Sequence, residues 1–60
     1  MNTYEIKFNG QITKLRSECE ACAIAEVANQ NSVSVNALWA AGAEIRVITL
    51  SFTSDFRPIW

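Results

Sequence analysis

A pair of cysteines separated by two residues, Cys19 and Cys22, is the sharpest motif in this sequence. It stands where a helix is expected to begin, and a helix N-terminus lowers the pKa of a thiol and favours the reactive thiolate. The carboxylates of Glu18 and Glu20 oppose this effect, because they disfavour a further negative charge nearby. On a helical wheel Cys19 lies opposite the apolar stripe and Cys22 lies at its flank, so we expect both thiols to be accessible.

Three interpretations of these thiols stay open. They are small side chains without a chemical role, a redox pair, or the ligands of a metal-linked dimer. The motif resembles that of the thioredoxin type in spacing, although the chain is too short for that fold and has no proline placed opposite the cysteines. A zinc site needs about four ligands, and the sequence has two cysteines and no histidine. We therefore expect no metal site, unless a symmetric dimer shares Cys19 and Cys22 from each copy. The plain structural reading is favoured.

No enzyme constellation accompanies the cysteines. The sequence has no histidine, no paired carboxylates in a catalytic arrangement and no glycine-rich phosphate loop. The residues that general acid–base catalysis and phosphoryl transfer require are therefore not found in the sequence. We predict that the protein is not an enzyme and that it uses no cofactor.

Cations and aromatic residues offer a second kind of chemistry, which is binding. Lys7, Lys14 and Arg16 are expected on one face of a hairpin, where they could meet an acidic protein surface or form a solvated face. The end of the chain carries Phe56, Arg57 and Trp60. Aromatic residues and arginine are the types that anchor protein interfaces, although this tail could instead close the core. The candidate partner-binding residues are Lys7, Lys14, Arg16, Phe56, Arg57 and Trp60.

The hairpin that positions these cations is the clearest structural signal. Asn9-Gly10 suits a two-residue type I′ turn, since both positions need a positive φ. Such a turn places Phe8 opposite Gln11 and fixes the rest of the register. One face then carries apolar side chains and the other carries charged ones. The apolar set is Tyr4, Ile6, Phe8 and Leu15, and the opposite set is Glu5, Lys7, Ile12, Lys14 and Arg16.

A helix should follow the hairpin directly. Ser17 and Glu20 fit a capping box, and the alanine-rich run to about residue 29 contains no glycine or proline. Ile24 and Val27 are its expected anchors on a stripe of mostly small residues. The stripe comprises Ala21, Ile24, Ala25, Val27 and Ala28.

The rest of the chain is predicted in three pieces. Residues 35–41 should form a short helix capped by Ser34 and ended by Gly42, although residues 33–41 could also be a strand. Residues 43–53 should form a strand, and residues 54–60 an aromatic tail or edge strand, because Pro58 excludes a central strand. The expected fold is a single α+β domain of residues 1–60, β-β-α-(short α)-β. Its three-stranded, mainly antiparallel sheet has the order 2-1-3, with a helix on one face.

The segment 25–41 resembles a helix-turn-helix of the repressor type. Val27 and Ala28 correspond to its first helix, Val33 and Ser34 open the second, and Leu38 is the buried anchor. The resemblance implies a small DNA-binding regulator that uses Ser34, Asn36 and Trp39. Against this, residues 35–41 contain no lysine or arginine, and cations supply much of the affinity for phosphates. Nucleic acid is therefore not the favoured partner.

Composition sets the remaining expectations. Sixty residues with a net charge of −1 and half of them hydrophobic suit one small globular domain, without a field that favours nucleic acid or an anionic membrane. With no apolar run long enough to span a membrane and no signal peptide pattern, we expect a cytoplasmic protein with reduced cysteines. A homodimer is as plausible as a monomer, since an open sheet leaves edges that can pair.

The favoured function is a non-catalytic protein–protein interaction module whose partner the sequence does not name. In size and style the chain is similar to accessory proteins of phages and other mobile elements, including inhibitors of host defence. If that is so, it works in the cytoplasm of the host cell. The DNA-binding regulator is the first alternative, and a thiol-dependent redox or metal-linked dimer is the second.

Overall fold

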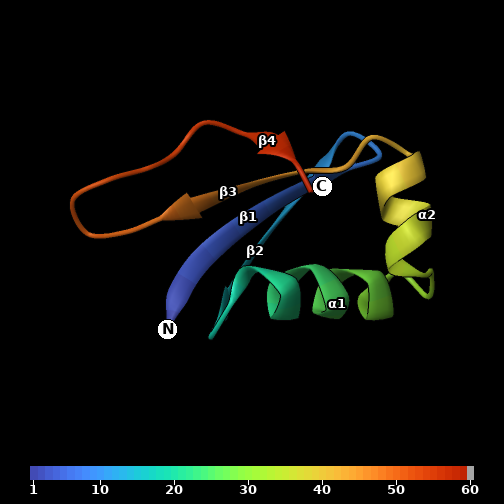
Figure 1. Ribbon diagram of the computed structural model, residues 1–60, viewed down its shortest axis with the longest axis horizontal. Helices are drawn as coiled ribbons and strands as arrows, with labels where there is room; N and C mark the ends of the chain where they lie inside the picture. Colours follow the sequence, from blue (N-terminus) through green and yellow to red (C-terminus); the bar gives the residue numbers. More distant parts are fainter. Residues whose placement is uncertain (60) are drawn as a thin grey trace.

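The computed structural model describes residues 1–59 and has the α+β fold that the sequence predicts (Figure 1). A sheet forms one layer, the helix α1 lies against one face of it, and α2 follows across the end of α1 (Figure 1). Trp60, a predicted partner-binding residue, lies outside the described residues. The elements, in chain order, are β1 (Asn2–Phe8), β2 (Gln11–Ser17), α1 (Glu20–Gln30), α2 (Val35–Ala40), β3 (Glu44–Ile48) and β4 (Arg57–Pro58).

The predicted hairpin register is confirmed. Phe8 lies opposite Gln11, Ile6 opposite Thr13 and Tyr4 opposite Leu15. Both turn residues have positive φ, 53° at Asn9 and 76° at Gly10, as a type I′ turn requires. The predicted order 2-1-3 is confirmed as well, because β3 pairs with β1 in antiparallel orientation.

The sheet gains a fourth strand, so within residues 1–59 its order is β2-β1-β3-β4. The gain follows from an early end of β3, which stops at Ile48 and not near residue 53. Both the N–H and the hydroxyl of Thr49 donate to the carbonyl oxygen of Phe52, and the chain reverses there. Such side-chain-to-backbone bonds compete with strand pairing. The returning segment then pairs Arg57 with Ile45, which makes the expected edge strand.

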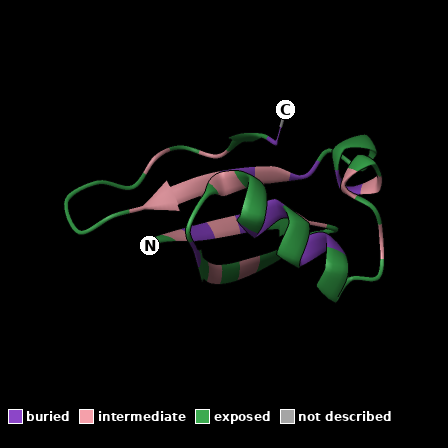
Figure 2. Cartoon of the chain, turned by 60° about the horizontal axis from the view of Figure 1, so that its bottom comes forward, coloured by how far each residue is buried: buried purple, intermediate pink, exposed green. Residues whose placement is uncertain are grey.

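The core lies between the sheet and the helices (Figure 2). Ile6, Leu38 and Val27 are fully buried, and Ile45 and Ile24 nearly so. Ile24 and Val27 are thus the anchors of α1, as predicted, but Ala23 is buried while Ala21 and Ala25 are exposed. Ile59 is also buried, so the end of the tail contributes to the core.

The predicted capping box at the start of α1 is wrong. Cys19 is the N-cap, and its Sγ atom accepts a hydrogen bond from the backbone N–H of Cys22 at 3.1 Å. Ser17 cannot cap the helix, because it is the last residue of β2, paired with Asn2 and buried. The helix therefore begins two residues later than the sequence pattern indicates.

The short second helix is confirmed and residues 35–40 are not a strand. The Oγ atom of Ser34 accepts a hydrogen bond from the N–H of Ala37, and Gly42 ends the helix with φ 77°. The helix α1 ends in the same way at Ser32, which has φ 57° although it is not glycine. The N–H of Val33 then donates to the carbonyl oxygen of Ala28, as in a Schellman motif.

Candidate functional site

The face of the sheet opposite the helices is the candidate binding surface, and we call it the outer face. Side chains alternate between the two faces of a strand, and Tyr4, Ile6 and Ile45 point to the helices. The intervening residues of β1, β2 and β3 therefore belong to the outer face. They are Thr3, Glu5, Lys7, Ile12, Lys14, Arg16, Glu44, Arg46 and Ile48.

The outer face gathers most of the positive charge of the chain. It carries four of the five lysine and arginine residues, namely Lys7, Lys14, Arg16 and Arg46, but two of the six acidic residues. The face therefore has two more positive than negative charges, although the whole chain has a net charge of −1. The remaining carboxylates lie on α1 or in the segments beside it and after β3, at Glu18, Glu20, Glu26 and Asp55.

One ion pair on this face is partly shielded from water. The Nε and Nη2 atoms of Arg46 both lie 2.5 Å from Oε1 of Glu5, and the Glu5 side chain is 15% exposed. Lys14 lies opposite Glu5 in the register, but Arg46 is the cation that binds the carboxylate. Lys7, Lys14 and Arg16 thus stay exposed on a face where one of the two carboxylates is already paired.

Phe56 lies over two of the cations of the outer face. Its ring centroid is 4.6 Å from Cζ of Arg46 and 5.3 Å from Nζ of Lys7. Both contacts are in the range of cation–π interactions. The segment after β3 therefore returns across the sheet, and Phe56 joins Lys7, Lys14 and Arg16 on one surface. Beside Arg16 the surface is hollowed, and this shallow hollow is lined by Met1, Thr3, Arg16, Ile48, Thr49 and Leu50.

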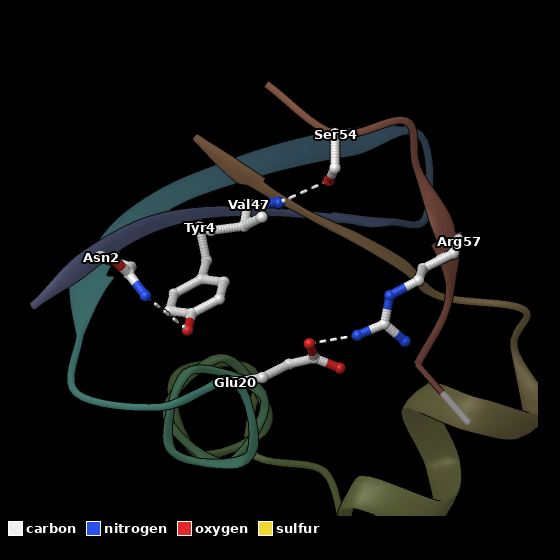
Figure 3. A network of polar contacts seen from close by, with 6 residues as sticks. All are labelled: Asn2, Tyr4, Glu20, Val47, Ser54 and Arg57. Carbon is white, nitrogen blue, oxygen red and sulfur yellow. Dashed lines mark hydrogen bonds and ion pairs between the residues drawn. The ribbon is translucent and has the colours of Figure 1, made fainter. Parts of the chain in front are cut away.

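Arg57 does not belong to this surface. It lies opposite Ile45, on the side of the helices, and its Nη2 atom binds the carboxylate of Glu20 on α1 (Figure 3). The same view shows Ser54 holding the returning segment to β3, where its hydroxyl accepts a hydrogen bond from the N–H of Val47 at 3.0 Å. Phe56 and Arg57, the two candidate residues of the tail that the structure describes, thus lie on opposite faces of the sheet.

The two thiols are both exposed, as predicted. The pKa of Cys19 is lowered, chiefly by a hydrogen bond from the Cys22 thiol and then by the Cys22 backbone N–H. The pKa of Cys22 is raised by the same contact with Cys19 and by partial desolvation. Glu18 raises both pKa values, as the sequence indicates. Within residues 1–59, no group of three or more potential metal ligands lies together.

The residues of the DNA-binding alternative lie on or beside α2. The Ser34 hydroxyl already accepts the capping hydrogen bond, Asn36 is exposed, and Trp39 is 56% exposed. The helix has six residues and no cation, so its exposed side offers one amide and one indole.

Arg46 was missed by the sequence reasoning. The sequence could have indicated this residue, because its position between Ile45 and Val47 places it on the face of the strand opposite two apolar residues of the core side.

Comparison of the chain with protein-family models, curated proteins and solved structures found no match. Neither of the described helices is long and apolar enough to cross a membrane.

Proposed function

We propose that this protein is a non-catalytic interaction module that binds an acidic protein surface through its outer face. The observation that carries the proposal is the concentration of four of the five cations on the side of the sheet that the helices leave uncovered. A positive patch on a chain with net negative charge attracts an acidic partner in one orientation, because the rest of the molecule repels it.

The uncovered side chains suit a protein partner. Phe56 is half-buried over Arg46 and Lys7, and Ile12 on the same face is 50% exposed. Apolar and aromatic area beside arginine is typical of the central part of a protein interface. A partner that covers this face would bury apolar surface and pair the exposed cations at the same time.

Such a module would act by occlusion, since the cations and the aromatic ring of the outer face would cover part of the partner's surface. This mode of action matches the small accessory proteins of phages and mobile elements that inhibit a host macromolecule. The residues assigned to the contact are Lys7, Lys14, Arg16 and Phe56 from the candidates that the sequence predicts, together with Arg46. Arg57 is assigned to the fold, because its guanidinium binds Glu20.

Two variants of equal net charge test the proposal. Lys14→Gln with Arg16→Gln removes two positive charges from the outer face. Ala25→Glu with Asn36→Asp adds two negative charges at exposed positions of the helices. In capture experiments from host lysate, the first variant should lose the proteins that the native chain binds, and the second should keep them. High salt should release them.

Equal capture by both variants would overturn the proposal, because the position of the charge would then not matter. Capture that disappears after nuclease treatment and is lost in Asn36→Ala would instead favour the DNA-binding regulator. Loss in Cys19→Ser with Cys22→Ser alone would favour the thiol-dependent function.

A further inference from the structure

The free edge of the sheet at β2 shares its residues with the cationic outer face. Among the described strands, β2 pairs with β1 alone and stands at the margin of the sheet (Figure 2). It is seven residues long, which exceeds the length of β3 and β4. An unpaired strand of this length presents a row of N–H and C=O groups that another strand can bind.

The hydrogen bonds of the sheet identify which residues present these groups. The N–H of Ser54 donates to the carbonyl of Val47, and that of Ile59 to Ala43, so alternate residues of β3 face away from β1. The remaining β3 residues bond β1 at Thr3, Glu5 and Lys7, and the other β1 residues bond β2. It follows that Ile12, Lys14 and Arg16 turn their backbone groups to the free edge.

The same three residues carry their side chains on the outer face. An added antiparallel strand would therefore place every second side chain beside Ile12, Lys14 and Arg16. Its intervening side chains would lie next to Thr13 and Leu15, which are half-buried on the helix side. The two sides of β2 thus prefer different residues: carboxylates on the outer face and small or β-branched apolar residues on the inner one.

We propose that β2 accepts an antiparallel strand of a partner protein in which acidic and apolar residues alternate. This inference rests on the proposed function, and it names the segment that the outer face recognises. The backbone of β2 supplies the affinity common to all strands, and Lys14 and Arg16 select a strand with carboxylates opposite them.

A second copy of the chain fits this edge less well. Antiparallel pairing of β2 with itself in the register that places Lys14 opposite Lys14 also brings Ile12 opposite Arg16. Like charges directly opposite each other on neighbouring strands are destabilising. Lysines on an edge strand are a common means of preventing such self-pairing. We therefore expect the isolated chain to be a monomer in sedimentation experiments.

The test uses a blocked peptide of alternating glutamate and valine that matches the seven residues of β2. In the proposed pairing, the glutamates lie on the outer face and their N–H groups point to β2. N-methylation of the glutamates should lower the affinity at least about tenfold, since it removes several hydrogen bonds. The N–H groups of the valines point to solvent, so N-methylation of the valines should leave the affinity within about twofold of that of the unmodified peptide. Loss of binding with the valine-methylated peptide alone would contradict the antiparallel register.

Variants of the protein separate this inference from the proposed function. Ile12→Pro removes one edge-facing N–H without a change of charge, and proline is tolerated at such positions. Ile12→Thr keeps the N–H and is the matched control. Both variants lose the Ile12 side chain but only proline loses the N–H, so binding should fall further in Ile12→Pro than in Ile12→Thr, while Lys14→Gln with Arg16→Gln weakens it through the charge.

The outcomes are distinguishable. If the glutamate-methylated peptide binds as well as the unmodified one, and Lys14→Gln with Arg16→Gln still weakens both, the cationic face binds without strand addition and this inference is wrong. If the charge variants change nothing, the proposed function fails too. A dimer of the free chain that Ile12→Pro dissociates would assign the edge to self-association and overturn the inference.

Discussion

The ring of Phe56 covers the guanidinium of Arg46 at 4.6 Å, and the same guanidinium binds Glu5 from the neighbouring strand. This relationship joins the segment after β3 to the outer face of the sheet. It also shields an ion pair that would otherwise be open to water, which strengthens the attraction between its charges. Phe56 is thus both a structural clamp and part of the proposed contact surface.

Replacement of Phe56 measures the clamp. Phe56→Ala removes two cation–π contacts and partly buried apolar area, so it should lower the free energy of unfolding by about 1–2 kcal/mol. Phe52→Ala is the matched control, because Phe52 is 60% exposed in the turn after β3 and should change stability by less than about 0.5 kcal/mol. Urea unfolding of both variants makes the comparison. Equal effects would show that the cation–π contacts add nothing.

The end of the tail should matter through Ile59. This residue is 7% exposed and belongs to the core, so Ile59→Ala should lower the free energy of unfolding by about 2 kcal/mol or more. Leu50→Ala alters a fully exposed side chain and should be nearly neutral. Thermal unfolding of the two variants distinguishes them. A neutral Ile59→Ala would mean that the tail does not close the core in solution.

Substitution of two serines between α1 and α2 should change the stability of the protein in opposite directions. Ser32 holds a positive φ of 57°, so Ser32→Gly should stabilise the protein by about 0.5–1 kcal/mol. Ser34 caps α2, and Ser34→Ala should destabilise it by about 1 kcal/mol. Denaturant midpoints of the two variants test both effects. Destabilisation by Ser32→Gly would contradict the described turn.

The thiol of Cys19 should react before that of Cys22. Its lowered pKa depends first on the hydrogen bond from the Cys22 thiol. Alkylation of Cys19, followed by mass spectrometry over a pH series, should therefore have a midpoint below the ordinary thiol value. Cys22→Ala should raise this midpoint, whereas Cys22→Ser keeps a donor and should raise it less. A midpoint unchanged by Cys22→Ala would show that the hydrogen bond has no effect.

The same shift predicts a pH dependence of stability. Because folding lowers the pKa of Cys19, this thiol contributes stability above its ordinary pKa and loses it as the pH falls through the folded value. Cys22 has a raised pKa and acts in the opposite direction. The variant Cys22→Ser removes the Cys22 thiol and its opposing effect. In this variant the free energy of unfolding should rise with pH between the folded and the unfolded pKa of Cys19. A flat profile would contradict the assignment.

The sequence predicted what depends on neighbouring residues. Asn9-Gly10 determined the hairpin register, and Ser34 and Gly42 bounded α2, because each acts through its own backbone geometry. Ser17 misled, since its capping pattern competes with strand pairing to Asn2, which the local sequence does not reveal. The cation–π contacts of Phe56 with Lys7 and Arg46 were also missed, because they join three segments that are far apart in the chain.

The central claim is that a partner binds the outer face and not α2. The most direct measurement is a map of backbone amide chemical shifts in the isotope-labelled chain, titrated first with the alternating acidic peptide and then, separately, with duplex DNA. We predict that the peptide shifts most strongly the amides of Ile12, Lys14 and Arg16, which face the free edge of β2, and leaves those of Asn36 and Trp39 in place, while DNA has little effect. Shifts confined to Asn36 and Trp39, or produced by DNA alone, would contradict this account.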